Sequence, residues 1–174
     1  MINCRPTKHS IDGLYDFIFY IQKFYDTKKL SIIEIGSWKG ESARIFADYF
    51  KIVYCVDPWD VENAPIPMKP DVKIAESMID KLVKEKKNII KIKGTSAEVV
   101  KNINKFFDVV YIDALHEYDD VKADVMAWKD KSIKFIGGHD YRVNTNGVIL
   151  AVNEILGKPD RTFKDWSWIK GVKC

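Results

Sequence analysis

Hydrophobic residues occur along the chain in two patterns, short unbroken runs and longer stretches with helical spacing. The runs, rich in Ile and Val, cover 30–35, 52–56, 89–92, 109–112 and 133–136. Unbroken apolar runs of this length are typical of strands that are buried on both faces of a parallel sheet. In the stretches between them, apolar residues recur every three or four positions, which predicts helices. The predicted helices cover 10–28, 40–50, 71–87, 97–104, 117–129 and 147–156.

The order of these elements predicts the fold class. Strand and helix alternate five times, and the chain then ends in two short stretches, 162–163 and 166–172, that suit a β-hairpin. We therefore expect a doubly wound α/β fold with a mostly parallel seven-stranded sheet and a C-terminal antiparallel hairpin. A single domain over 1–174 would contain an N-terminal helix at 10–28, a core at 30–157 and the hairpin at 161–173.

Composition narrows the class of protein. Hydrophobic residues make up 47% of the chain and charged residues 30%, as expected for a soluble globular protein. The net charge is only +3 and the lysines are spread among acids, so we expect no nucleic-acid partner. No stretch suits a signal peptide or a membrane span, and Cys4, Cys55 and Cys174 form no metal or redox spacing. These features predict a cytoplasmic protein with no membrane partner.

The stretch 32–60 has the layout of a nucleotide-binding βαβ unit. A strand containing Glu34 is followed by a turn with Gly36 and Gly40, then by a helix, a second strand and Asp57. Glycines allow the sharp turn and let a ligand approach the backbone. Asp57 ends the neighbouring strand, so its carboxylate would lie beside the turn and can accept hydrogen bonds from both hydroxyls of a ribose.

Two missing features indicate which nucleotide suits this turn. A dinucleotide fingerprint needs a second glycine where this chain has Trp38, and a P-loop needs Lys where it has Glu41. A carboxylate at that point would repel phosphate. The turn therefore suits a nucleoside without phosphates, and the alternative is a strand-to-helix turn that binds no ligand.

The spacing Glu34-x-Gly36-x-x-x-Gly40, followed by Asp57, resembles the first two motifs of class I S-adenosylmethionine-dependent methyltransferases. The resemblance implies that the turn holds the methionine part of S-adenosylmethionine and that Asp57 holds its ribose. Residues after the third strand would lie near the adenine, and the rings after the first two strands would line the pocket. The implied cofactor-binding set is Glu34, Gly36, Ser37, Trp38, Gly40, Asp57, Trp59, Thr95, Ser96 and Asp113.

A second pair of motifs contains the candidate catalytic side chains. The pattern I-D-x-x-H-x-Y at 112–118, followed by G-G-H-D-Y at 137–141, resembles a small methyltransferase group whose members methylate hydroxyls of sugars, antibiotics and other small molecules. An alcohol is a weak nucleophile at neutral pH and needs a base or a metal ion. The resemblance implies catalytic roles for Asp113, His116 and His139, with His116 as the base because histidine side chains ordinarily gain and lose a proton near neutral pH.

The resemblance also implies a metal site. In catechol-type relatives an acid after the fourth strand and an acid-containing pair after the fifth hold one divalent ion, and Asp113, His139 and Asp140 match these positions. His139 departs from the relatives, which have a carboxylate or amide there. Magnesium prefers oxygen ligands, so this set suits manganese, iron or zinc better. The alternatives are that His139 only hydrogen-bonds the glycine-rich turn and that His116 only holds the loop before the next helix.

The sequence thus predicts an S-adenosylmethionine-dependent methyltransferase that acts on a hydroxyl of a small molecule or sugar, with manganese, magnesium or iron as a second cofactor. A methyltransferase-like binding domain without activity is one alternative, and a nucleotide-dependent oxidoreductase, disfavoured by Trp38, is another. The proline-rich stretch 57–70 suits a lid or a substrate-facing loop. Acceptor selection would come from this loop, from the N-terminal helix or from the second subunit of a homodimer.

Overall fold

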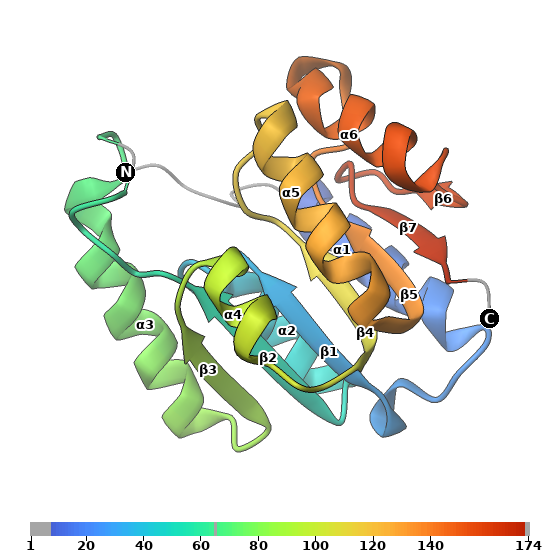
Figure 1. Ribbon diagram of the computed structural model, residues 1–174. Helices are drawn as coiled ribbons and strands as arrows, with labels where there is room; N and C mark the ends of the chain where they lie inside the picture. Colours follow the sequence, from blue (N-terminus) through green and yellow to red (C-terminus); the bar gives the residue numbers. More distant parts are fainter. Residues whose placement is uncertain (1–7, 65, 173–174) are drawn as a thin grey trace.

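The predicted fold class is confirmed by the structure, a computed structural model that describes residues 8–64 and 66–172. Seven strands form one sheet in the order β3-β2-β1-β4-β5-β7-β6 (Figure 1). The first five run parallel to their neighbours, whereas β7 is antiparallel to both β5 and β6. The strands are β1 (Ser31–Ile35), β2 (Ile52–Asp57), β3 (Ile89–Lys93), β4 (Phe107–Ile112), β5 (Ser132–Gly138), β6 (Arg161–Thr162) and β7 (Trp168–Gly171).

Helices cover both faces of the sheet. One face packs against α1 (Lys8–Gln22), α2 (Glu41–Tyr49) and α3 (Val72–Glu85). The other packs against α4 (Ser96–Asn102), α5 (Tyr118–Trp128) and α6 (Asn146–Leu156), which lie nearest the viewer in Figure 1. Short 3₁₀ turns complete the chain: η1 (Thr27–Lys29), η2 (Lys69–Asp71), η3 (Lys129–Lys131) and η4 (Val143–Thr145).

The helices on both faces of the sheet explain why the strands are unbroken apolar runs in the sequence. Successive side chains of a strand point to opposite faces of the sheet. Ile32 therefore joins the core under α1 to α3, and Ile33 joins the core under α4 to α6, each with no exposed surface. Because both faces are covered, both positions must be apolar, and the alternation typical of half-exposed strands is absent from β1.

The first helix is shorter than its hydrophobic pattern predicts. It ends at Gln22, not at 28, because Lys23 N and Phe24 N donate to carbonyl groups three residues earlier and tighten the last turn. Asp26 then caps η1 through Lys28 N. The helix begins at Lys8, two residues before the predicted start at 10.

The starts of three other helices differ in how they are capped. Thr95, not Ser96, caps α4, because the Thr95 side chain and Glu98 form a reciprocal capping box. Asn146 is the first residue of α6 and not its cap. Asp71 precedes α3 but makes no capping bond, and its carboxylate lies 3.6 Å from Lys39 Nζ. Gly157 ends α6 with a φ of 73°.

Some apolar side chains of the helices are exposed. Met78 of α3 and Met126 of α5 have relative exposures of 43% and 54%, because the buried stripe of each helix is narrower than its apolar pattern. Cys55 is buried, whereas Cys4 and Cys174 lie outside the described residues. In the described parts of the chain, no helix combines the length and the apolarity needed to cross a membrane.

Candidate functional site

The carboxyl ends of the parallel strands meet at one edge of the sheet, as predicted. The start of antiparallel β7 lies at the same edge, because Trp168 pairs with Gly138 at the end of β5. In the described parts of the chain, all four non-glycine residues with positive φ lie in loops at this edge: Trp38 (43°), Trp59 (39°), Asp140 (59°) and Trp166 (64°). Residues other than glycine rarely adopt a positive φ, because it strains the backbone. Such strained residues tend to cluster at functional sites.

The glycine turn after β1 is held against two neighbouring strands. Gly36 N and Ser37 N both donate to Val56 O of β2, at 2.8 and 3.1 Å. Gly36 has a φ of 88°, and a Cβ there would overlap the backbone of Asp113 and Ala114 after β4. The turn therefore touches the loop that carries the second motif, and only glycine permits the contact.

Glu34 lies beneath this turn and has no exposed surface. Its Oε1 accepts a hydrogen bond from Ser42 Oγ in the first turn of α2. Ser37 is also buried, and its hydroxyl faces the Glu34 carbonyl at 3.4 Å. Burial and the charge of Glu34 raise the pKa of the neighbouring Cys55 thiol. In the structure Glu34 thus supports the turn from beneath, and its predicted contact with a cofactor stays a prediction.

Asp57 holds the two loops that follow β1 and β2. Its Oδ2 accepts a hydrogen bond from Trp38 N and its Oδ1 accepts one from Trp59 N, both at 3.0 Å. Each oxygen keeps a further lone pair for another donor. Burial raises the pKa of Asp57 above its usual value, although the two backbone bonds oppose this, and the charge of Glu76 adds to the rise.

The two tryptophans predicted to line the pocket have different surroundings. Trp59 is 2% exposed, donates from Nε1 to Trp38 O at 2.9 Å and has Lys91 Nζ 4.8 Å from its ring centre. Its ring belongs to the core. Trp38 is partly exposed, and its buried Nε1 has no hydrogen-bond partner within the described chain. Trp38 is thus the ring that offers an unused donor at this edge.

The hydroxyls after β3 are engaged by the protein. Thr95 is occupied by the α4 capping box, and Ser96 Oγ accepts a hydrogen bond from Trp128 Nε1 at 2.9 Å. Burial raises the pKa of Asp124 to about 6, while a hydrogen bond with Ser96 lowers it and the charge of Asp120 adds to the rise. Ser96 therefore links α4 to α5, and its predicted position beside an adenine stays a prediction.

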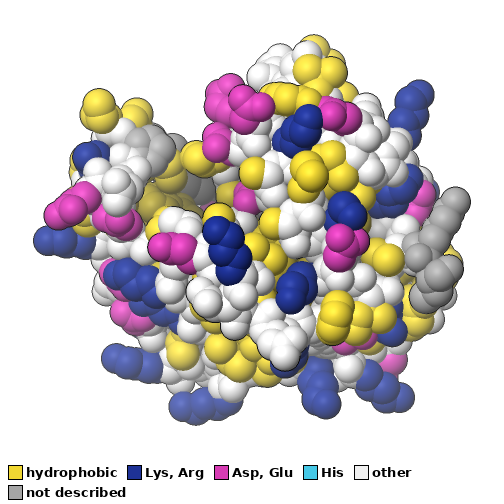
Figure 2. Space-filling view, in the orientation of Figure 1, with side chains coloured by type: hydrophobic (Ala, Val, Ile, Leu, Met, Phe, Trp, Pro, Cys, Tyr) yellow, Lys and Arg dark blue, Asp and Glu magenta, His cyan; other side chains and the backbone are white. Residues whose placement is uncertain are grey.

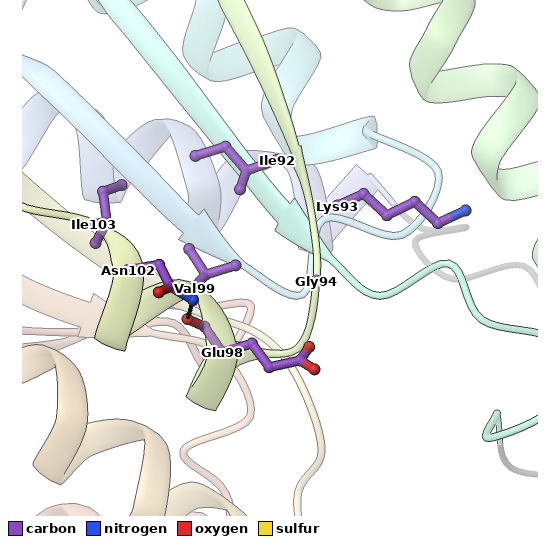
Figure 3. Close-up of a pocket in the computed structure, with 7 residues that line it drawn as sticks. All are labelled: Ile92, Lys93, Gly94, Glu98, Val99, Asn102 and Ile103. Atoms are coloured by element: carbon purple, nitrogen blue, oxygen red, sulfur yellow. Dashed lines mark hydrogen bonds between the residues drawn. The ribbon is translucent and has the colours of Figure 1, made fainter.

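A groove of about 540 Å³ opens beside this loop, between β3 and α4. In Figure 3 the apolar side chains of Ile92, Val99 and Ile103 converge on it, whereas the end of Lys93 points away. A second groove, of about 450 Å³, lies between α1, α2 and α3 and includes Lys39 and Gly40. Neither groove contains Asp57 or the residues of the second motif.

The second motif brings four titratable side chains together. His116 Nε2 lies 3.0 Å from Asp140 Oδ2 and 4.0 Å from Asp113 Oδ1. His139 Nδ1 lies 3.1 Å from the same Asp140 oxygen and 3.8 Å from the same Asp113 oxygen. The His116 side chain is 43% exposed and that of His139 only 13%. His116 thus borders solvent, and His139 lies deeper in the cluster.

Asp140 is the centre of this cluster. Burial alone would raise its pKa, but the hydrogen bond from His139 and the charges of His139, His116 and Arg142 outweigh that effect and lower it. Arg142 Nη2 lies 3.0 Å from Asp140 Oδ1, and the guanidinium also covers the Trp166 ring at 4.5 Å. Asp140 is therefore held as a carboxylate.

The same cluster contains a suitable ligand set for a metal ion. Asp113, His139 and Asp140 each offer one donor atom, and these atoms lie within 4.8 Å of one another. Two carboxylates and one imidazole suit manganese, iron or zinc better than magnesium. The three predicted ligands are thus adjacent in the fold, although they come from two different loops.

Two residues of this edge were missed by the sequence patterns. Arg142 follows Asp140 by two positions, so the sequence spacing alone could have indicated that the two side chains lie close together. Asp165 lies in the hairpin, and its Oδ2 is 4.0 Å from His139 Nε2. Nothing in the local sequence signals this contact, because it depends on β7 pairing with β5.

Three solved structures illustrate what the fold is similar to. An O-methyltransferase from Bacillus cereus in complex with SAH is 14% identical, with 97% of this chain and 92% of that chain covered and a TM-score of 0.56. Fibrillarin from Aeropyrum pernix with bound S-adenosyl-L-methionine is 12% identical (94% and 76% covered, TM-score 0.64). An rRNA methylase from Streptococcus thermophilus is 9% identical (92% and 97% covered, TM-score 0.63). These low identities establish the fold alone.

Comparison at the level of sequence gives the family. No curated protein sequence matches the chain. The sequence model of one family, described as a methyltransferase domain, matches residues 33–141. That range runs from β1, through the glycine turn and Asp57, to the loop after β5, and it includes the whole second motif. The chain therefore belongs to the methyltransferase-domain family.

Proposed function

We propose that the protein is an S-adenosylmethionine-dependent O-methyltransferase that acts on a hydroxyl of a small molecule or sugar. The observation that carries the proposal is the contact between the Gly36 turn and the Asp113 backbone. This contact joins a nucleoside-type turn to a cluster of two histidines and two carboxylates. A cofactor site and a proton-accepting site therefore share one edge of the sheet.

The residues around the turn fit S-adenosylmethionine. Asp57 has lone pairs left for ribose hydroxyls, and Trp38 Nε1 is a buried donor with no partner among the described residues. The missing side chain of Gly36 lets the turn lie directly against the backbone of Asp113 and Ala114. When bound, S-adenosylmethionine supplies an electrophilic methyl group on a cationic sulfur. No phosphate-binding element is needed for such a ligand, which agrees with Glu41 at the start of α2.

In this proposal His116 accepts the proton of the acceptor hydroxyl. Its Nε2 lies 3.0 Å from Asp140 Oδ2, so an Nε2–H can donate to that carboxylate. The lone pair of the neutral ring then lies on Nδ1, which becomes the proton-accepting atom. The partial exposure of His116 leaves it accessible to an acceptor. Asp140 orients the ring and stabilises the imidazolium that forms.

Asp113, His139 and Asp140 would hold a divalent cation, which when bound stabilises the oxyanion of a deprotonated hydroxyl. The chain's own residues contribute the alignment. His139 is nearly buried and fixes one side of the cluster, whereas Asp113 follows β4 and meets it from the neighbouring loop. We propose manganese or iron as the bound cation, because magnesium fits a ligand set that contains an imidazole less well.

A small acceptor is supported by the surroundings of the cluster. Exposed apolar side chains follow β4 and β5 and precede β7, namely Leu115, Val143 and Trp166. Lys, Arg, Asp and Glu side chains are interspersed on the face shown in Figure 2, where an RNA-binding surface would gather positive charge. We therefore propose a small molecule with an apolar or ring portion, and we propose no nucleic-acid or membrane partner.

The test is transfer of labelled methyl from S-adenosylmethionine to panels of phenols and sugars, with and without manganese, and to an rRNA fragment. We expect product only with hydroxylated small molecules, and a loss of product when His116 is changed to Ala. Labelling of RNA alone would contradict the acceptor class. Absence of both S-adenosylmethionine binding and transfer would contradict the proposed function as a whole.

A further inference from the structure

Three hydrogen bonds connect Asp57, Trp38 and Trp59 in a closed ring. Asp57 accepts two of them, from Trp38 N at Oδ2 and from Trp59 N at Oδ1, each at 3.0 Å. The third runs from Trp59 Nε1 to Trp38 O at 2.9 Å. The loops after β1 and β2 are therefore joined twice, once through the Asp57 carboxylate and once through the Trp59 indole.

The backbone at both tryptophans is strained. Trp38 has a φ of 43° and Trp59 a φ of 39°, in the left-handed region that residues other than glycine rarely adopt. A strained conformation of this kind persists only where the surrounding structure holds it in place. The ring of hydrogen bonds does so here, because each tryptophan takes part in two of its three bonds.

The Trp59 indole is fixed by its contacts with β3 and α3. It is 2% exposed, and Lys91 Nζ lies 4.8 Å from the ring centre. Two acids of α3 hold that ammonium group, Glu76 at 2.9 Å and Asp80 at 2.7 Å. A cation over the face of an indole attracts the ring, and more strongly where water is excluded. The indole is therefore held in the orientation in which its N–H reaches the Trp38 carbonyl.

We propose that Trp59 is a positioning residue, which fixes the Asp57 carboxylate for a ribose by holding the Trp38 backbone. Loss of the Nε1 bond would release Trp38 O, and the strained residue would relax away from its φ of 43°. Trp38 N would then turn away from Asp57 Oδ2, and the carboxylate would lose one of the two donors that set its orientation. Its remaining lone pairs would no longer face both ribose hydroxyls.

This role is indirect. The buried ring of Trp59 donates its one N–H group to the protein and acts through Trp38 and Asp57. That the ligand is the ribose of S-adenosylmethionine rests on the proposed function, whereas the effect of Trp59 on the Trp38 backbone does not. One experiment without ligand and one with ligand separate the two.

The experiment without ligand measures hydrogen exchange at the backbone N–H of Trp38. Trp59→Phe removes the indole donor and keeps a ring in the core. The protein is labelled with ¹⁵N-tryptophan, the chain has five tryptophans, and a Trp38→Phe variant assigns the signal. We expect exchange at least about tenfold faster in Trp59→Phe than in the native protein, because opening of the loop no longer breaks the Nε1 bond.

Trp128→Phe is the matched control. Trp128 is also buried, and its Nε1 donates to Ser96 Oγ at 2.9 Å. The control therefore loses the same atoms and one hydrogen bond of the same kind, but outside the ring formed by Asp57, Trp38 and Trp59. We expect native exchange at Trp38 N in this variant.

The experiment with ligand is a double-mutant cycle in which calorimetry measures the affinity for S-adenosylhomocysteine. We expect Trp59→Phe to weaken binding about tenfold in the native background and less than about twofold in the Asp57→Ala background, where no carboxylate remains to be oriented. A residue that only stabilises the core would lower the affinity equally in both backgrounds. Trp128 takes no part in the ring, so any effect of Trp128→Phe on affinity should be the same in both backgrounds.

Native exchange at Trp38 N in a folded Trp59→Phe variant would overturn the inference. So would an equal loss of affinity in the two backgrounds, because Trp59 would then act on the ligand without Asp57. Faster exchange in a protein that binds no S-adenosylhomocysteine would uphold the hold of Trp59 on Trp38 and contradict the proposed function. If Trp59→Phe does not fold, β-(3-benzothienyl)alanine at position 59 gives the same test, since it has the shape of tryptophan without the N–H group.

Discussion

Changing Gly36 to Ala tests whether the turn after β1 depends on close backbone contact. Gly36 has a φ of 88°, and a Cβ there would overlap backbone atoms of Asp113 and Ala114, which cannot rotate away. The left-handed conformation costs about 1–2 kcal/mol for a residue with a Cβ, and forced overlap adds about 1–3 kcal/mol. The lower entropy of the unfolded Ala chain offsets about 0.4–1 kcal/mol. We expect a net loss of about 1–5 kcal/mol in the free energy of unfolding.

Gly157 offers a control in which a positive-φ glycine is replaced away from this edge. A Cβ there would meet only Lys170 Nζ, at 3.9 Å, but the residue has a φ of 73° and a ψ of −178°, a conformation that is essentially limited to glycine. Gly157→Ala therefore costs about 1–3 kcal/mol through backbone strain alone. It shows whether a general loss of stability, without overlap at the turn, weakens cofactor binding.

Urea denaturation followed by circular dichroism gives both free energies, and calorimetry gives S-adenosylmethionine affinity. We expect Gly36→Ala to bind at least about tenfold more weakly, because the overlap must displace the turn, an effect of about 1.4 kcal/mol. Gly157→Ala should bind like the native protein. Native stability or native affinity in Gly36→Ala would refute the reasoning, as would an equal loss of affinity in Gly157→Ala.

Three further predictions address single side chains. Asp57→Ala should weaken S-adenosylmethionine binding by about 1–3 kcal/mol in calorimetry, because ribose hydroxyls lose their acceptor. The control is Asp48→Ala, at an exposed carboxylate, which should not change the affinity. Equal affinities of Asp57→Ala and the native protein would argue against the ribose role. His116→Ala should lower the methyl-transfer rate about a hundredfold with cofactor affinity unchanged, and loss of both would mark the residue as structural. Asp124 has a pKa of about 6 in the folded protein against an ordinary 3.8, so its ionised form is disfavoured by folding, and stability falls as pH rises from about 4 to 6. Asp124→Asn should therefore raise the free energy of unfolding by up to about 3 kcal/mol at pH 7 and by almost nothing at pH 4 in urea titrations, and a loss at pH 7 would contradict the pKa.

Much of the fold follows from patterns within the sequence. Continuous apolar strands require helices on both faces of the sheet. Ile32 and Ile33 pack against opposite helix layers. The edge at which Asp57, Asp113 and Asp140 gather follows from parallel strands with right-handed crossovers. These features depend on periodicity and strand order, which a single sequence records.

Details that depend on contacts across the fold could not be predicted in this way. The fully buried position of Glu34 results from α2 folding back over β1, so that Ser42 reaches the carboxylate. Trp59 is buried with Lys91 above its ring, although its sequence position matched that of a pocket residue. Asp165 meets His139 only because β7 runs back beside β5. None of these contacts produces a recognisable pattern in the neighbouring sequence.

The most direct measurement is a crystal structure of the protein with S-adenosylhomocysteine and manganese. The account predicts the nucleoside at the Gly36 turn, with both ribose hydroxyls on Asp57 and the sulfur facing the cluster formed by Asp113, His116, His139 and Asp140. A nucleoside in the groove between β3 and α4, or at the opposite edge of the sheet, would contradict it.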